Sequence, residues 1–559
     1  MLKRHNENIG VYILIYLNLL FWLIPIYYLI QLQLVKAQDF KEKIDYYGIN
    51  KTIKPLRGKI YVQDKNSNLY LVAETKKIYD VYFNPLKSKD PEQEINLISK
   101  ILKIDKDKIN TKKQSSFIIA KEVEESVLNE LLKLKLDSLF YEENLKRVYP
   151  EDHFLSTIIG FASYDENEGL LKGRYGIEKY YDEILKGEKG LYFGVNKIKT
   201  EIPGADIVLN IDYFLQKYSE KILQEAVKEY QAEGGLISIV TNDGKILALA
   251  EEPNYNLNKF PEIKNYNTFL TKFVQNYEPG SVIKTITFFA GLDNNVFKSS
   301  DKYFDSGYIK VDNWTIYNFD KKGRGEVTFE QAFEQSLNTG AMHIQKLLGN
   351  YRFLSYLKKF RFNLKPFIDF PNLNDGNIKN LEKSPRDLRD VNFLTASFGH
   401  GISISPVHLI QASTVFANKG EMVKLNFVDR INFSDGSIEK NTKKIVTKIG
   451  SEESINEIKY LLEQVTLDGG GKKAKTEGYR IGGKTGSAYI PKVNEPGYSD
   501  DVINTYIALF PLSNPKFIIF VRIDKPNQGL AMVTTVPVAK KVIDYLIDYY
   551  NIPPDDIQE

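Results

Sequence analysis

Three short strings of residues supply the side chains that acyl transfer to a serine hydroxyl requires. Ser-Val-Ile-Lys occupies residues 281–284, Ser-Leu-Asn occupies residues 336–338, and Lys-Thr-Gly-Ser occupies residues 484–487. A serine becomes a nucleophile when a nearby base takes its proton, and a lysine with a lowered pKa can be that base. The candidate catalytic residues are Ser281, Lys284, Ser336 and Asn338, and the candidate substrate-binding residues are Lys484, Thr485, Gly486 and Ser487.

Each string is a weak signal when it is taken alone. Ser-x-x-Lys begins at five serines and Ser-x-Asn at two, so a single match also has a structural explanation. Ser281 after Pro279-Gly280 would ordinarily be a helix N-cap. The middle string would be surface residues or a local turn, and the last one a glycine-rich hairpin. The presence of all three strings in this order favours the catalytic interpretation.

The nucleophile segment predicts both a helix and a usable base. Ser281 opens an apolar helix that we expect over residues 282–292. Lys284 would lie one turn later on the same face. Its apolar neighbours should lower the pKa of the Lys284 ammonium by desolvation, which makes a general base near neutral pH.

The other two strings should complete the site from separate elements. Ser336 and Asn338 fall within a helix predicted over residues 329–348, from which they would relay protons and hold the substrate amide. Residues 484–490 follow two glycines and predict an edge strand, to which a bound peptide could add. The backbone amides of Ser281 and Ser487 are candidates for an oxyanion hole.

The surrounding pattern predicts an α+β domain in which an antiparallel sheet is flanked by helices. The turn between the strands expected at 235–240 and 245–250 is Asn242-Asp243-Gly244, a good hairpin signal. The expected elements, in order, are a strand at 207–211, a helix at 213–230, strands at 235–240 and 245–250, strands at 506–510 and 517–523, and a helix at 538–550.

The N-terminal end carries one apolar run, residues 11–30. Twenty helical residues at about 1.5 Å each match the hydrocarbon core of a bilayer. We expect a retained single-pass anchor. The alternatives are a cleaved signal peptide, for which Val35-Lys36-Ala37 offers a loose cleavage sequence, and a buried core helix. Basic residues lie on both sides of the run, so charge does not decide its orientation.

The region after the anchor has a mixed character. Residues 36–54 are polar and fit a stalk, and alternating residues at 59–62 and 69–72 predict strands. Residues 92–146 predict mostly helix, with 122–136 as one amphipathic segment.

Length and composition bear on the number of domains and on the kinds of ligand that we expect. The 559 residues exceed one ordinary core, so we expect two or more soluble domains. With 75 basic and 72 acidic residues the formal net charge is only +3, which gives no reason to expect a nucleic-acid partner. Cysteine is absent, and the five histidines lack the spacing of metal ligands, so we expect neither a metal nor a cofactor.

These residues resemble a known family, the class B penicillin-binding proteins, which are monofunctional peptidoglycan D,D-transpeptidases. The resemblance covers nearly the whole chain, and three of its segments are similar to the cell-division branch, so we favour the septal branch over the elongation branch. Besides the three strings, the segments that carry it are Arg57-Gly-Lys-Ile60, Arg147-Val-Tyr-Pro150, Gly173–Glu178 through Gly187, Tyr277–Ser281, Phe398–Pro406 and Ala417–Gly420.

The resemblance implies a domain organisation, a cellular location and a set of partners. It implies a cytoplasmic stub and transmembrane anchor at 1–35, an elongated α+β N-terminal dimerisation or pedestal domain at 36–200, and a transpeptidase domain at 201–552. The catalytic domain would lie outside the cytoplasm, on the inner or plasma membrane of a bacterium. The implied partners are stem peptides ending in D-Ala-D-Ala, β-lactam antibiotics, a polytopic glycan polymerase and other division proteins.

The resemblance also implies a mechanism. Ser281 would attack the carbonyl between the last two D-alanines after losing its proton to Lys284, and an amine of a neighbouring stem would resolve the acyl-enzyme. Ser336 and Asn338 would relay protons and hold the substrate amide. Lys484 and Thr485 would bind the terminal carboxylate.

The sequence departs from the family pattern in two places, and three other functions are alternatives to the transpeptidase interpretation. Leu337 stands where one form of the family has Asp, and Ser487 stands where threonine is common. A glycosyltransferase module is not recognisable, because only Glu151-Asp152 resembles the start of its first motif. A serine β-lactamase would be about half this length, a membrane-bound β-lactam sensor would need more spans, and a non-catalytic divisome scaffold would not need the motif side chains.

Overall fold

The computed structural model describes residues 3–31, 33, 50–106, 109, 115–193, 196–383, 390–492 and 495–556. The chain forms two compact units. One consists of Met1–Leu56 with Gly187–Pro203, and the other of Arg57–Lys186 with Gly204–Glu559. The loose cleavage sequence at 35–37 and most of the predicted stalk lie outside the described residues.

The first unit contains the predicted apolar helix. Helix α1 covers Lys3–Ile30, and its segment Ile13–Ile30 has a mean hydropathy of 2.1 with no residue buried. By length and composition it is the one helix among the described residues that is able to cross a membrane. The unit also holds a small antiparallel sheet, whose strands are β1 (Asn50–Ile53), β8 (Gly190–Phe193) and β9 (Asn196–Lys199).

The second unit begins with a long sheet in the order β19-β18-β10-β2-β3-β4, in which β5 also pairs with β3. Strand β2 pairs with β10 in parallel, while the other pairs are antiparallel. The strands are β2 (Ile60–Gln63), β3 (Leu69–Phe83), β4 (Phe117–Glu124), β5 (Leu139–Val148), β10 (Asp206–Asp212), β18 (Val428–Asn432) and β19 (Ile438–Lys440).

The expectation that 92–146 is mostly helical is wrong. Among the residues that the structure describes in this range, α3 (Pro91–Leu102) and α4 (Glu125–Leu132) are the α-helices, and β4 and β5 fill much of the rest. The 15-residue strand β3 offers its edges to both. Pairing with a long strand outweighs the local preference of charged residues such as Lys121 and Glu143, because strand propensity depends strongly on context.

A buried ionic cluster joins three of the segments singled out in the sequence. Glu178, which is fully buried, accepts hydrogen bonds from Arg57 Nε at 2.7 Å and from Arg147 Nε at 2.6 Å. Arg57 also reaches Asp182 at 2.6 Å, and the Tyr149 hydroxyl lies 3.3 Å from Glu178. The two guanidinium groups hold the pKa of Glu178 below its usual value despite burial, which raises it.

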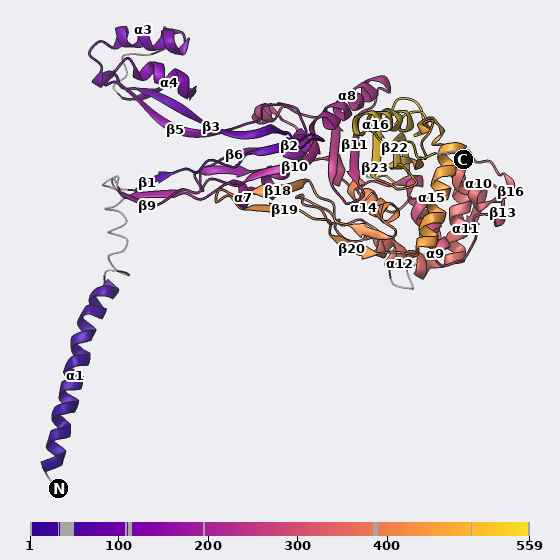
Figure 1. Ribbon diagram of the computed structural model, residues 1–559, viewed down its shortest axis with the longest axis horizontal. Coiled ribbons are helices and arrows are strands. Elements are labelled where there is room, and N and C mark those ends of the chain that lie inside the picture. The colour runs from indigo at the N-terminus through magenta and orange to yellow at the C-terminus, as the bar shows by residue number, and fades with distance from the viewer. Residues whose placement is uncertain are drawn as a thin grey trace. The chain divides into compact units, whose positions relative to one another are not determined.

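The catalytic region is built on a five-stranded antiparallel sheet in the order β12-β11-β23-β22-β21. Helices α8 (Tyr213–Glu229) and α16 (Thr535–Tyr550) lie together against one face, next to β11, β22 and β23 (Figure 1). The strands are β11 (Gly234–Thr241), β12 (Ile246–Glu252), β21 (Gly482–Pro491), β22 (Tyr498–Phe510) and β23 (Phe517–Asp524).

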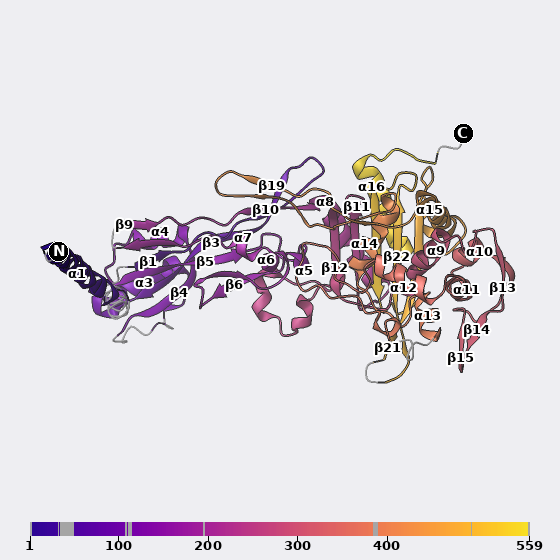
Figure 2. The same ribbon diagram turned by 90° about the horizontal axis from the view of Figure 1, so that it is seen from below.

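Helices also cover the opposite face of this sheet. Helix α14 (Pro406–Ala417) packs on β23, and α15 (Glu452–Leu467) packs on both β21 and α9 (Lys284–Asp293), next to the strands in Figure 2. Side chains of β23 alternate between the two helical layers, with Ile519 and Ile518 on opposite faces. The predicted fold class, an antiparallel sheet flanked by helices and preceded by an α+β module, is confirmed.

Shorter elements complete the second unit. The β14–β15 hairpin and the antiparallel pair of β13 and β16, which flank it in the chain, precede the helices that carry the middle string. These elements are α5 (Ser156–Ile159), β6 (Ala162–Asp165), β7 (Leu170–Gly173), α6 (Gly176–Tyr180), α7 (Asp182–Leu185), β13 (Lys302–Asp305), β14 (Tyr308–Val311), β15 (Trp314–Tyr317), β16 (Gly325–Thr328), α10 (Phe329–Glu334), α11 (Asn338–Leu348), α12 (Asn350–Lys359), α13 (Asp390–Ala396), β17 (Glu421–Val423) and β20 (Ile445–Lys448).

Candidate active site

Ser281 lies in a 3₁₀ turn, Gly280–Ile283, that leads directly into α9. Pro279 is the N-cap of this turn, so Ser281 is not the cap that the structural alternative required. Gly280 has φ of +58°, and Gly399 packs so closely on it that a Cβ at Gly399 would lie 2.2 Å from the Gly280 oxygen. This contact ties the nucleophile segment to the loop after α13.

Lys284 is completely buried and reaches the middle string directly. Its Nζ donates to the Ser336 carbonyl oxygen at 2.6 Å, lies 3.2 Å from Ser336 Oγ, and donates to Asn338 Oδ1 at 2.8 Å. Burial, and then the charge of Lys484, hold the pKa of Lys284 well below its usual range. The lowered pKa agrees with the expectation from its apolar neighbours.

The helix predicted over 329–348 is wrong at its centre, because it is broken at Ser336. Helix α10 ends at Glu334 and α11 begins at Asn338. Ser336 adopts φ of +56°, the Leu337 amide donates to the Ala332 oxygen at 2.8 Å, and the Ser336 amide donates to the Phe333 oxygen at 3.1 Å. These two bonds form a Schellman ending with serine at the position where glycine is usual.

Lys484, from the third string, contacts the Ser336 hydroxyl, as Lys284 does. Its side chain is buried, and its Nζ donates to Ser336 Oγ at 2.9 Å and to its neighbour's carbonyl, Thr485 O, at 3.2 Å. Burial lowers the pKa of Lys484 to about 7. The Ser336 hydroxyl therefore lies between two buried lysine amines, each with a lowered pKa.

Strand β21 is an edge strand, as predicted, and it runs beside the nucleophile turn. A Cβ at Gly486 would lie 3.0 Å from Val282 Cγ1 and 3.1 Å from the Pro279 oxygen, so glycine allows the strand to approach the turn closely. Ser487 Oγ donates to Asn504 Oδ1 at 2.7 Å and accepts from the Ala531 amide at 3.1 Å. Its hydroxyl thus joins β21 to β22 and to the loop before α16.

Two open clefts meet at Ser281, and Ser487 and Phe319 line both of them. The Phe319 ring stacks on Tyr489 at 6.0 Å between centroids. The first, here the Asp468 cleft, has a volume of about 380 Å³ and is lined by Ser281, Phe319, Glu334, Gln335, Ser336, Asp468, Gly469, Gly470, Thr485, Ser487, Leu530, Ala531 and Met532. The second, here the His400 cleft, has about 550 Å³ and is lined by Ser281, Thr315, Ile316, Tyr317, Asn318, Phe319, Lys321, Asn338, Thr395, Phe398, His400, Gly401, Ser487, Tyr489 and Tyr498.

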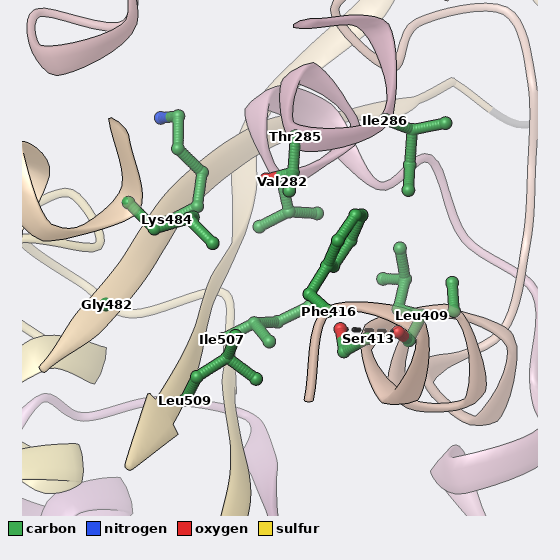
Figure 3. Close-up of a pocket in the computed structure, with 12 residues that line it drawn as sticks. Val282, Thr285, Ile286, Leu409, Ser413, Phe416, Gly482, Lys484, Ile507 and Leu509 are labelled. Carbon is green, nitrogen blue, oxygen red and sulfur yellow. Dashed lines mark hydrogen bonds between the residues drawn. The ribbon is translucent and has the colours of Figure 1, made fainter. Parts of the chain in front are cut away.

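A small apolar cavity lies under the nucleophile turn, between α9, α14 and strands β21 and β22. Val282, Ile286, Leu409 and Phe416 point into it, while the Lys484 side chain extends away from it (Figure 3), where its amine contacts the Ser336 hydroxyl. Its volume of about 30 Å³ suits at most one water, so it belongs to the packing of the site and not to substrate binding.

The structure adds residues that sequence reasoning did not connect with the site. Asn338 Nδ2 donates to the Tyr317 oxygen at 2.9 Å, and the Thr339 amide donates to Asn318 Oδ1 at 3.1 Å. His400, whose spacing suited no metal, lines a cleft at Ser281, and burial together with the charge of Lys284 lowers its pKa to about 4. Only the Phe398–Pro406 resemblance could have indicated His400, and nothing local indicated Asn318.

The arrangement of lysines, hydroxyls and an edge strand defines a serine acyltransferase site, and comparisons with known proteins agree. The penicillin binding protein transpeptidase domain matches residues 235–544, and the penicillin-binding protein dimerisation domain matches residues 52–202. The chain belongs to the penicillin-binding protein transpeptidase family. The predicted class, a class B penicillin-binding protein and a serine-type transpeptidase, is confirmed.

Individual relatives cover most of the chain. It is 29% identical to stage V sporulation protein D of Bacillus subtilis over 88% of this chain and 78% of that protein. It is 27% identical to a peptidoglycan D,D-transpeptidase FtsI homolog of Mesostigma viride over 85% of each. The crystal structure of penicillin binding protein 2X from Streptococcus thermophilus has the same fold, with a TM-score of 0.78 at 21% identity over 90% of this chain and 81% of that one.

Proposed function

We propose that this transpeptidase cross-links peptidoglycan stem peptides ending in D-Ala-D-Ala through an acyl-enzyme on Ser281. One observation supports this most strongly. The amines of Lys284 and Lys484 lie 3.2 and 2.9 Å from the same Ser336 hydroxyl, and that serine lines the Asp468 cleft together with Ser281. Lys284 as the base, together with the Ser336 hydroxyl that it shares with Lys484, forms a path for the protons that acyl transfer moves.

The proposed reaction has two steps. In the first, Lys284 takes the Ser281 proton, Ser281 Oγ bonds to the carbonyl carbon, and the bond to the terminal D-alanine breaks. The leaving amine gains a proton through Ser336, and the amides of Ser281 and Ser487 stabilise the oxyanion, where one such donor contributes about 2.7–4 kcal/mol. In the second, an acceptor amine attacks the ester carbonyl, loses a proton to the same groups, and frees Ser281.

The remaining substrate contacts follow from the edge strand. Lys484 and Thr485 would bind the terminal carboxylate, Asn338 would hold the substrate amide, and the peptide would add to β21 by main-chain hydrogen bonds. A β-lactam presents a strained amide and a carboxylate at a similar spacing, so it should acylate Ser281 and remain there. The proposed steps use serine and lysine side chains and backbone amides, and such serine chemistry needs no metal or cofactor.

We further propose a place for the enzyme. Helix α1 would anchor it in the bacterial inner or plasma membrane, with the catalytic domain outside the cytoplasm, and septal wall synthesis is favoured over elongation. A polytopic glycan polymerase and other division proteins would contact α1 and the 36–200 domain. The boundaries at 35 and 200 remain predictions.

Labelling with a fluorescent penicillin tests the proposal. The wild-type chain should form a covalent adduct that persists for hours, and Ser281→Ala should form none while melting at a similar temperature. Rapid release of the label would indicate a β-lactamase. A wild-type chain that takes no label would contradict the acyl-enzyme and favour a scaffold.

A further inference from the structure

A third cavity, with a volume of about 400 Å³, lies beside the outer half of β21 and is here called the Arg522 pocket. It shares Tyr489 and Gly401 with the His400 cleft, so the two are neighbours along the same strand. Its lining consists of Asn276, Tyr277, Glu278, Asn377, Gly401, Ile402, Ser403, Ala488, Tyr489, Ile490, Pro491, Ile503 and Arg522.

Arg522 is the unusual member of this lining, because it is only 6% exposed and incompletely paired. Its Nε donates to Asp524 Oδ1 at 2.5 Å, and its guanidinium carbon lies 4.5 Å from the centre of the Tyr277 ring. Its Nη1 is buried and has no hydrogen-bond partner among the described residues. Unpaired buried donors are costly and rare in folded proteins, so this nitrogen calls for an acceptor.

Because the unpaired nitrogen belongs to a cation, an anionic acceptor would suit it best. Asp524 is shared between Arg522 and Lys272, whose Nζ lies 2.9 Å away, so two cations face one carboxylate. Asp524 is not part of the pocket lining, and the carboxylate that is, Glu278, already accepts from the Gly401 amide at 3.0 Å and from the Tyr498 hydroxyl at 3.1 Å. Asn276 Oδ1 is likewise buried without a partner in the described part of the chain, and it would suit an N–H next to the anion.

The position of the pocket relates it to the donor peptide. Ser487 lines both clefts at Ser281, and the pocket lining begins one residue further along β21, at Ala488, and ends at Pro491. Residues in a strand advance by about 3.3 Å each. A peptide paired along β21 with its scissile carbonyl at Ser281 would therefore bring its second or third preceding residue to the pocket.

We propose that the Arg522 pocket is a subsite for a carboxylate that the donor peptide carries two or three residues before the scissile bond. The subsite rests on the proposed function and specifies its substrate. The planar guanidinium matches a carboxylate in shape and charge, and a carboxamide in the same place would keep the shape and lose the charge. Arg522 acts here as a specificity-determining residue, remote from the reacting atoms.

The test uses two synthetic peptides ending in D-Ala-D-Ala that differ in one group. One carries a free carboxylate at the second or third residue before the scissile bond, and the other a carboxamide. Release of D-alanine by the full chain gives kcat/KM for each, per site counted by penicillin labelling. The wild type should prefer the acid by about tenfold, as expected for one charge-assisted pair.

In Arg522→Gln the preference should fall to about one, through loss of rate with the acid alone. Arg480→Gln is the matched control, because Arg480 pairs with Glu463 at 2.6 Å and lies outside the pocket lining. It should keep the wild-type preference. If Arg522→Gln does not fold, as judged by its melting temperature, the wild-type ratio still decides.

The possible outcomes test the Arg522 subsite and the proposed transpeptidase function separately. Equal rates for acid and amide in the wild type, or an unchanged preference in Arg522→Gln, would overturn the subsite and leave the transpeptidase proposal intact. A chain that releases D-alanine from neither peptide and takes no penicillin would overturn both.

Discussion

The Ser336 hydroxyl is the point where two buried amines meet, and this shared contact governs how the site should respond to pH. Lys284 and Lys484 both have pKa values lowered by burial, and the charge of Lys484 lowers that of Lys284 further. The proposed roles need the two lysines in opposite states: Lys284 neutral as a base, and Lys484 charged to hold a carboxylate. Since the two amines are close, charging one makes the other easier to deprotonate.

We therefore expect a bell-shaped pH profile for acylation by penicillin. The rate should fall at low pH as Lys284 becomes protonated, and it should fall again as pH rises through about 7, where Lys484 loses its charge. Second-order labelling rates between pH 5 and 10 measure both limbs. In Lys484→Arg the alkaline limb should disappear, because arginine stays charged. An unchanged alkaline limb in that variant would assign the limb to another group.

At the scale of elements, the site depends on a helix that stops between two functional residues. The Schellman ending of α10 turns the Ser336 carbonyl toward Lys284, and α11 then starts at Asn338. A non-glycine residue at φ of +56° costs stability that glycine would not. The strained backbone and the hydroxyl are thus separable properties of one residue.

Ser336→Gly should separate them. The variant should unfold at the same temperature as the wild type or slightly above it, because glycine adopts this φ without strain. Acylation should nevertheless slow by about 10²-fold or more, because the proton path loses its hydroxyl. Thermal unfolding and labelling rates check the two parts, and Ser454→Gly, at a capping box of α15, is a contrasting control that should lose stability and keep acylation.

Sequence reasoning predicted the helix after Ser281 and the edge strand and singled out the three strings that the fold brings together, because each is encoded by local pattern and spacing. It missed the break at Ser336, since a Schellman ending without glycine carries no local signal. It also missed strands β4 and β5, whose pairing with β3 is set by residues far along the chain. Asn318 and Arg522 were missed for the same reason, because their significance comes from what the fold places beside them.

At the scale of the whole molecule, Arg57, Arg147 and Glu178 give three of the segments that resemble the family a structural role, because they form one buried ionic cluster. These residues come from three segments that are separate in sequence, and all three are nearly inaccessible to solvent. Burying two guanidinium groups against one carboxylate is tolerable only while every partner is present. The cluster therefore holds together the N-terminal part of the second unit.

Glu178→Gln should destabilise the chain by about 3–5 kcal/mol, because both guanidinium groups lose their common counter-charge. Glu183→Gln is the control: Glu183 pairs with Lys186 on the surface with 81% of its side chain exposed, and its loss should change stability by less than about 1 kcal/mol. Denaturant unfolding of both variants measures the difference. Equal effects would show that the buried cluster is replaceable.

The parallel pairing of β2 with β10 has a practical consequence for anyone who wishes to produce the catalytic region by itself. Strand β10 follows residue 200, yet one of its two neighbours, β2, precedes that point by more than a hundred residues. In a fragment starting at 201, β10 would keep β18 on one side. Its other side would expose unpaired backbone amides and carbonyls, which can pair with other copies of the fragment. A fusion that carries only residues 57–63 would restore this neighbour but leave the other side of β2, which pairs with β3, unpaired, so the extension should also include β3 and its partners β4 and β5.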